Sequence, residues 1–214
     1  MPVEAKICGL TRAADADAAA AAGASYLGVV FAGGPRLVDP GRAREIAAAG
    51  RGLPVLGVFG TQRPAEILRI VRDAGLAGAQ LHGDYSREDA RELRAEGLIV
   101  WRVVRIALPA DLDRLDEASM DADAVLVEPR VAHMAGGTGV SLDLAVAREA
   151  RARLVGARMV LAGGLTPATV GAAAALVRPE VVDVSSGVES LPGIKDPFRI
   201  AAFLEAAFGP SPIP

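Results

Sequence analysis

Short apolar segments alternate with longer segments of helical character along the whole chain. The apolar segments are rich in Val, Leu and Ile, which is typical of parallel strands that are covered on both faces. They predict eight strands, at residues 3–8, 26–31, 54–59, 78–82, 98–106, 124–128, 158–162 and 181–185. Each strand is followed by a segment long enough to form a helix.

The segments between the strands carry start and stop signals of helices. Pro40 suits a first helical turn, Gly23 and Gly50 stand where a helix would stop, and Ser86 can serve as an N-cap. These segments predict eight helices, at residues 13–22, 40–49, 64–74, 87–96, 109–117, 142–152, 167–177 and 197–208.

The even alternation of strand and helix indicates the fold class. Eight βα units of similar length are the pattern of a (β/α)8 TIM barrel. A doubly wound sheet is the alternative, but it needs neither eight even units nor one mouth at which all strand ends converge. We therefore expect a single barrel domain over residues 1–208 and a frayed C-terminal tail over residues 209–214.

Composition and charge narrow the class of protein. Hydrophobic residues make up 51% of the chain and aromatic residues only 4%, so Val, Leu, Ile and Ala must build the core. A net charge of −3 gives no electrostatic reason to expect nucleic acid as a partner. No apolar run is long enough to span a membrane and no signal-peptide pattern is found, so we expect no membrane partner and a cytoplasmic location.

Cysteine and histidine usage bears on metals and cofactors. The single cysteine, Cys8, excludes an internal disulfide and a multi-cysteine zinc site. The two histidines are distant in sequence, the carboxylates have no metal-ligand spacing, and no dinucleotide-binding fingerprint is found. We therefore expect no metal and no cofactor. Alanine-rich helix faces suit a monomer and a homodimer alike, so the oligomeric state stays open between the two.

The ends of several predicted strands are polar, and in a barrel the chemistry lies at the carboxyl ends of the strands. The first strand ends with Lys6 and Cys8 on one face, where a nearby cation would lower the pKa of the thiol and favour a thiolate base. Arg36 follows the second strand in a glycine-rich loop and suits a planar carboxylate. The fourth and sixth strands end at His82 and Glu128. An inert thiol, a solvated arginine and a structural histidine are the alternative interpretations.

The sixth, seventh and eighth units each have a glycine-rich strand end. Such turns present backbone N–H groups to an oxyanion, and the last two lie where barrels commonly bind phosphate. This favours a TIM barrel of the phosphate-binding type with a phosphorylated small molecule as substrate. A phosphate anchor beside a thiolate and an acid favours isomerisation by proton transfer. The candidate phosphate-binding residues are Gly137, Thr138, Gly139, Gly163, Gly164, Ser185, Ser186 and Gly187.

Six motifs at or after the strand ends form a recognisable set. They are Lys-Ile-Cys-Gly-Leu-Thr at 6–11, Gln-Leu-His-Gly at 80–83, Gly-Gly-Thr-Gly at 136–139, Ala-Gly-Gly-Leu at 162–165, Asp-Val-Ser-Ser-Gly-Val-Glu at 183–189 and Pro-Gly-Ile-Lys-Asp at 192–196. Together they resemble the phosphoribosylanthranilate isomerase family of tryptophan biosynthesis. The first and last motifs are specific, whereas the glycine motifs alone are shared by many phosphate-binding barrels.

The resemblance implies an Amadori rearrangement of N-(5-phosphoribosyl)anthranilate to the 1-deoxyribulose phosphate. In that family a general acid protonates the furanose ring oxygen, which opens the ring to a Schiff base, and a general base removes the C2′ proton. Cys8 is the implied base, and Arg36 is implied to hold the anthranilate carboxylate. Lys6, His82 and Asp183 are implied to line the substrate site, with the glycine and serine turns around the phosphate.

The chain departs from the family pattern at two positions. The family's general acid is an aspartate at the end of the sixth strand, where this chain has Glu128, so Glu128 becomes the candidate acid and His133 a less favoured substitute. Gly34 stands where a small polar residue usually precedes the arginine. Two alternatives therefore stay open: a catalytically impaired paralogue that binds a sugar phosphate, and another phosphate-binding barrel enzyme such as indole-glycerol-phosphate synthase or the histidine-pathway aminoaldose isomerase.

Overall fold

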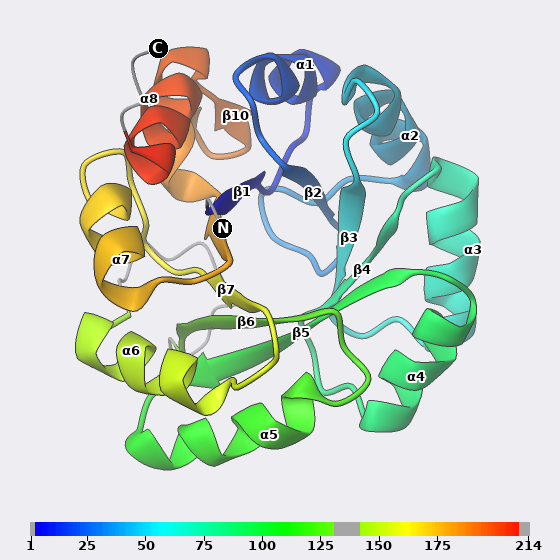
Figure 1. Ribbon diagram of the computed structural model, residues 1–214. Coiled ribbons are helices and arrows are strands. Elements are labelled where there is room, and N and C mark those ends of the chain that lie inside the picture. Colours follow the sequence, from blue (N-terminus) through cyan, green and yellow to red (C-terminus); the bar gives the residue numbers. More distant parts are fainter. Residues whose placement is uncertain (1–2, 131–141, 210–214) are drawn as a thin grey trace.

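The computed structural model describes residues 3–130 and 142–209 and has the predicted fold. Within these residues, eight parallel strands close into a barrel in the order of the sequence, and eight α-helices surround it (Figure 1). The barrel strands are β1 Glu4–Ile7, β2 Tyr26–Val30, β3 Val55–Phe59, β4 Gly78–Leu81, β5 Ile99–Ile106, β6 Ala124–Pro129, β7 Met159–Leu161 and β8 Val181–Val184. Because β1 pairs with both β2 and β8, the doubly wound alternative is wrong.

The helices follow the strands one by one, as the predicted βα units require. They are α1 Ala13–Ala21, α2 Pro40–Ala49, α3 Pro64–Ala74, α4 Arg87–Ala95, α5 Arg114–Ser119, α6 Leu144–Arg153, α7 Val170–Val177 and α8 Pro197–Phe208. Three of them, α2, α3 and α8, have the predicted bounds. The predicted fifth helix is instead a 3-10 helix, η1 Pro109–Asp113, followed by α5, and α7 begins later than expected.

A small hairpin near the C-terminus is absent from the sequence prediction. A short 3-10 helix, η2 Ser186–Val188, leads into β9 Glu189–Leu191, which pairs antiparallel with β10 Ile194–Lys195. These strands are too short to produce a period-two pattern, so the sequence carries no signal for them. Figure 1 shows β10 beside α8 and α1, next to the barrel.

The apolar side chains form two clusters because residues of a barrel strand point alternately inward and outward. The larger cluster fills the layer between the strands and the helices. The smaller one fills the barrel interior, and its members include Leu56, Trp101, Leu126, Val160 and Val181. The core is therefore built mainly from aliphatic residues, as the composition indicates.

Along β5 the barrel interior changes from apolar to polar. Trp101 and Val103 belong to the interior cluster, and Arg105 follows on the same face, where it makes an ion pair. Arg102 points to the other face and pairs with Glu117 of α5. The interior thus becomes polar toward the carboxyl ends of the strands, where barrel enzymes carry out their chemistry.

Three sequence-based expectations concern the ends of the chain and membranes. None of the helices in the described part of the chain is long and apolar enough to cross a membrane. The predicted frayed tail lies, apart from Gly209, outside the described residues. The prediction that the domain extends over residues 1–208 is not tested at residues 1 and 2, which lie outside the described residues.

Ser86→Ala tests the predicted start of α4. Ser86 Oγ accepts a hydrogen bond from Asp89 N at 3.1 Å, and Asp89 Oδ2 accepts one from Ser86 N at 2.8 Å. We expect the variant to lower the free energy of unfolding by about 1 kcal/mol, since a helical N–H loses its partner. Urea denaturation measures the loss. Arg63→Ala is the control because Arg63 precedes α3 without a side-chain cap; equal losses would contradict the capping role.

Candidate active site

Lys6 is a fully buried lysine on the inward face of β1. Its ammonium group donates hydrogen bonds of 2.8 Å to Gln80 Oε1 and to Asp183 Oδ1, and it lies 5.4 Å from the centre of the Trp101 ring. Lys6 and Asp183 are direct partners in the β1–β8 register. Burial by itself lowers the pKa of Lys6, but the charges and hydrogen bonds of Asp183 and Cys8 together outweigh burial, and the net pKa is raised. Lys6 therefore stays protonated.

Gln80 connects Lys6 to His82. Since Gln80 Oε1 accepts from Lys6, its Nε2 group faces His82 Nδ1, at 3.2 Å. A neutral imidazole that accepts at Nδ1 carries its proton at Nε2. Burial, with Arg105 and Lys6 nearby, lowers the pKa of His82 to about 3, so the ring is neutral. Its Nε2 lies 3.2 Å from Glu128 Oε1, at an angle too poor for a hydrogen bond, and has no other partner among the described residues.

Glu128, the candidate acid, lies on the inward face of β6 and is buried. Arg105 Nε donates a hydrogen bond of 3.0 Å to Glu128 Oε1. Burial raises the pKa of Glu128, and Arg105 offsets only part of this effect. A carboxyl group with a raised pKa is suited to general acid catalysis near neutral pH.

Cys8 follows β1 and is buried, and its N–H donates to the Val184 carbonyl oxygen at 2.8 Å. A Cβ atom on Gly28 would lie 2.8 Å from Cys8 Sγ and 3.0 Å from Lys6 Cε, so Cys8 and Lys6 share the inward face as expected. The expected lowering of the thiol pKa is wrong for the free protein. Burial raises the pKa of Cys8, and Lys6 reduces that effect without reversing it.

Arg36 is paired with a carboxylate of the protein itself. Its Nε and Nη2 atoms donate to the two carboxylate oxygens of Glu189 at 2.7 Å each. Lys195 donates to Glu189 Oε1 at 2.8 Å and to the Ser185 carbonyl oxygen at 3.0 Å. Burial raises the pKa of Glu189, but the bonds from Arg36 and Lys195 outweigh it and the net pKa is lowered. This cluster ties the loop after β2 to the loop after β8.

The glycine-rich ends of β7 and β8 lie against each other. A Cβ atom on Gly187 would lie 2.0 Å from the Leu165 carbonyl oxygen, so this close approach needs a glycine. Gly163 and Gly164 have φ angles of +95° and +64°, which favour glycine too. The candidate phosphate-binding residues that the structure brings together here are Gly163, Gly164, Ser185, Ser186 and Gly187.

Some sequence expectations fall outside what the structure describes. The candidate phosphate residues Gly137, Thr138 and Gly139 and the substitute acid His133 lie within residues 131–141, outside the described residues. The described residues contain no group of three or more His, Cys, Asp or Glu side chains that could hold a metal ion. The absence of a cofactor stays a prediction.

The sequence analysis missed three residues of this site, Arg105, Gln80 and Glu189. Arg105 carries a usable signal, because period-two alternation along the fifth strand puts it on the face of Trp101 and at a strand end. Gln80 and Glu189 stand inside recognised motifs, but their partners come from distant strands and loops. Sequence spacing does not indicate such pairings.

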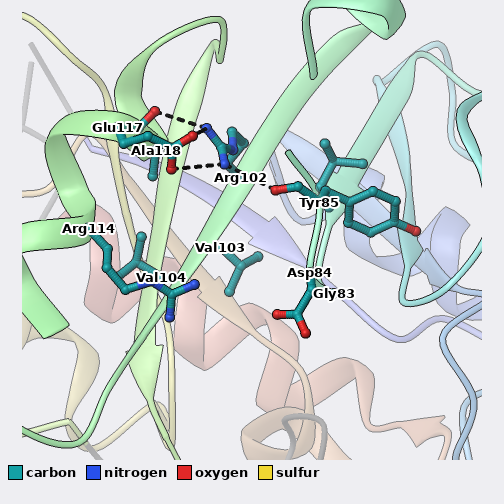
Figure 2. A pocket seen from close by; sticks show the side chains of 10 residues that line it. Gly83, Asp84, Tyr85, Arg102, Val103, Val104, Arg114, Glu117 and Ala118 are labelled. Atoms are coloured by element: carbon teal, nitrogen blue, oxygen red, sulfur yellow. Dashed lines mark hydrogen bonds and ion pairs between the residues drawn. The ribbon is translucent and has the colours of Figure 1, made fainter. Parts of the chain in front are cut away.

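A separate small pocket lies between β5, α5 and the loop after β4 (Figure 2). Arg102 lines it and donates to Glu117 Oε1 at 2.8 Å and to the Tyr85 carbonyl oxygen at 3.2 Å. The volume of about 30 Å³ is enough for one or two water molecules but not for a sugar phosphate. We assign the candidate site to the mouth of the barrel because barrel enzymes carry out their chemistry at the carboxyl ends of the strands.

The fold and the mouth define a class of protein, a (β/α)8-barrel enzyme with a buried thiol and a buried carboxyl group at the carboxyl ends of its strands. The family model described as N-(5′-phosphoribosyl)anthranilate (PRA) isomerase matches residues 5–206. The chain belongs to this family of isomerases, as the sequence motifs indicated.

Individual relatives agree with the family assignment. The N-(5′-phosphoribosyl)anthranilate isomerase of Paracoccus denitrificans is 42% identical, over 98% of this chain and 99% of the relative. The crystal structure of phosphoribosyl anthranilate isomerase from Thermotoga maritima has a TM-score of 0.86 and 33% identity, over 96% of this chain and 98% of that one. A structure of the isomerase in complex with reduced 1-(o-carboxyphenylamino)-1-deoxyribulose 5-phosphate has a TM-score of 0.81 and 33% identity, over 96% and 98%.

Gly28→Ala tests whether the side chains of Cys8 and Lys6 need the space that the missing side chain of Gly28 leaves. The added methyl group must displace these side chains, and a shift on the scale of ~1 Å can cost ~10²-fold in rate. We therefore expect isomerase turnover to fall roughly 10- to 100-fold. Gly57→Ala is the matched control, since its methyl group would crowd Phe59 in the outer layer instead. Equal losses of activity per folded molecule in both variants would contradict this role of Gly28.

The low pKa of His82 leads to a prediction of how the free energy of unfolding depends on pH. Unfolded histidine takes up a proton below about pH 6.5, whereas His82 resists protonation until about pH 3. Its contribution to stability is therefore fully present above pH 6.5 and is lost as the pH falls, by at most about 1.4 kcal/mol per pH unit. Urea denaturation of wild type and His82→Gln across this range measures the contribution. The variant should lose stability less steeply on acidification; parallel curves would refute the assignment.

Proposed function

We propose that this protein catalyses the Amadori rearrangement of N-(5-phosphoribosyl)anthranilate to 1-(2-carboxyphenylamino)-1-deoxyribulose 5-phosphate in tryptophan biosynthesis, with Cys8 and Glu128 as its catalytic residues. One observation carries the proposal: the thiol of Cys8 and the carboxyl group of Glu128 lie at the same mouth of the barrel. The chain that holds them matches the isomerase family over residues 5–206. The reaction needs only proton transfers, for which these two groups are suited.

Glu128 acts as the general acid and Cys8 as the general base. The Glu128 carboxyl group gives its proton to the furanose ring oxygen while the bond between C1′ and that oxygen breaks, which leaves a Schiff base at C1′. The Cys8 thiolate then takes the proton from C2′, and the electrons of that C–H bond form the enolamine. Tautomerisation of the enolamine gives the ketone.

Lys6 and Asp183 support the base in this proposal. Burial raises the pKa of Cys8, and the ammonium group of Lys6 is the largest influence that lowers it. Asp183 in turn keeps Lys6 protonated. Lys6 therefore stabilises the thiolate during proton transfer, although the charge of Asp183 itself raises the pKa of Cys8. His82 presents its neutral Nε2–H as a hydrogen-bond donor beside Glu128.

Arg36 is proposed to hold the anthranilate carboxylate. Glu189 occupies the Nε and Nη2 side of the guanidinium, and the edge formed by Nη1 and Nη2 can take a second planar carboxylate. Because Lys195 also pairs with Glu189, the three side chains together keep one net positive charge. An anionic substrate group is therefore attracted to Arg36 even though Arg36 already has an internal partner.

The phosphate is proposed to bind where the ends of β7 and β8 meet. Backbone N–H groups at Gly163, Gly164 and the turn 185–187 suit an anion, because the glycines allow the main chain to approach closely. The turn 137–139 is predicted to complete this site. A cytoplasmic location and a monomeric or homodimeric state also stay predictions.

A catalytically impaired paralogue that binds a sugar phosphate is the second candidate. The ion pair between Arg105 and Glu128 favours it, since the pair stabilises the ionised form of a group that must be protonated to act as an acid. Another phosphate-binding barrel enzyme has less support, because the isomerase family model matches nearly the whole chain.

The test follows the fluorescence decay of phosphoribosylanthranilate, generated in situ, with wild type, Cys8→Ala and Glu128→Gln. We expect wild type to turn over the substrate and each variant to lose roughly 10²-fold or more in kcat, because a proton-transfer group is gone. Affinity for a reduced product analogue should change little, since the anion contacts remain. Analogue binding without turnover by wild type would favour the impaired paralogue. An active Glu128→Gln enzyme would show that Glu128 is not the acid.

A further inference from the structure

Arg105 and Glu128 contact each other across the neighbouring strands β5 and β6. The two residues are direct partners in the parallel register, and both side chains lie on the inward face of the barrel. Arg105 Nε donates to Glu128 Oε1 at 3.0 Å, and Arg105 Nη2 donates to the His82 carbonyl oxygen at 2.5 Å. The guanidinium group thus bridges the carboxylate of β6 and the main chain that follows β4.

The charged and titratable groups around Glu128 come from four strands or strand ends. Arg105 faces Glu128 from β5, His82 from the end of β4, Lys6 from β1 and Asp183 from β8. Lys6 is already paired with Asp183, and His82 is neutral. The Glu128 side chain is 9% exposed and that of Arg105 is 29% exposed. Arg105 is therefore a cation at the edge of the mouth that pairs directly with a buried carboxyl group.

We propose that Arg105 is a positioning residue for Glu128, whose carboxyl group it holds at the mouth of the barrel by tying it to the main chain after β4. The inference rests on the function proposed above, in which Glu128 is the general acid. Arg105 acts through Glu128 and needs no contact with the substrate.

A glutamate needs such an anchor more than an aspartate does. Its extra methylene group adds a rotatable bond, so an untethered carboxyl group samples more positions. A misplacement of ~1 Å can cost ~10²-fold in rate. The N–H groups of a guanidinium have fixed relative directions, so the bond to the His82 carbonyl oxygen also fixes where the bond to Glu128 points.

The same contact influences the proton on Glu128. Burial raises the pKa of Glu128, and Arg105 is the largest influence in the opposite direction. A general acid works best when its pKa lies near the operating pH, because the carboxylate left after proton transfer must also be stable. Arg105 stabilises that carboxylate.

Two substitutions separate the anchor from the charge. Arg105→Gln removes the charge, whereas Arg105→Lys keeps it but cannot bridge two acceptors with a rigid fork. We expect Arg105→Gln to lower kcat roughly 10- to 100-fold with a smaller change in KM. Carbon-13 NMR of the Glu128 carboxyl group, without substrate, should show its pKa shifted upward. Arg105→Lys should return the pKa toward the wild-type value and restore kcat only in part.

Arg102→Gln is the matched control. Arg102 lies on the same strand, is buried and pairs with Glu117, but on the outer face (Figure 2). The control should lose stability while the pKa of Glu128 and the kcat per folded molecule stay unchanged. If the wild type is active and Arg105→Gln changes neither kcat nor the pKa of Glu128, this inference is overturned and the proposed function is not. An inactive wild type would overturn the proposed function, and this inference with it.

Discussion

A lysine ammonium group in the interior of a closed barrel must be neutralised by partners from the same interior. Lys6 is in this position, and a buried charge left without its partner would cost about 3–5 kcal/mol. Asp183 supplies the charge, and Gln80 supplies a second acceptor. Because Gln80 is then fixed in orientation, the tautomer of His82 follows as well. One buried cation therefore orders the polar groups that two other strands, β4 and β8, bring to the mouth beside Cys8.

Cations near the edge of the mouth are also paired with carboxylates. Three of its cations are matched with carboxylates of the protein; the pairs are Lys6 with Asp183, Arg36 with Glu189 and Arg105 with Glu128. Such pairing lets a site for an anionic substrate fold without strong repulsion between its cations. Lys195 is a fourth cation, and it pairs with Glu189, whose charge Arg36 already neutralises. The edge near the loop after β8 therefore keeps a net positive charge. The free protein is thus internally balanced and still attractive to anions.

The fold was predictable because each βα unit carries its own signals, such as the apolar strand of β3 and the N-cap Ser86 before α4. The position of Cys8 and Glu128 at the mouth of the barrel was predictable because both stand at strand ends, while their catalytic roles stay predictions. The pKa of Cys8 was not predictable, because burial and the nearby Lys6 act in opposite directions and only coordinates show which one prevails. The Arg36–Glu189 pair was missed because it joins segments that are distant in sequence. The β9–β10 hairpin was missed because its strands are too short to show a period-two pattern.

Position 128 shows why a single departure from a family pattern is hard to interpret by itself. A glutamate there, considered alone, indicates a longer and more mobile acid and therefore a weaker catalyst. The register of β5 and β6 adds Arg105, which bonds to Glu128 and to the main chain after β4 and so limits that mobility. Conversely, Arg105 without Glu128 would lose its carboxylate partner and keep only its bond to the His82 carbonyl oxygen among these contacts. The two residues therefore form one structural unit, and position 128 has to be interpreted together with position 105.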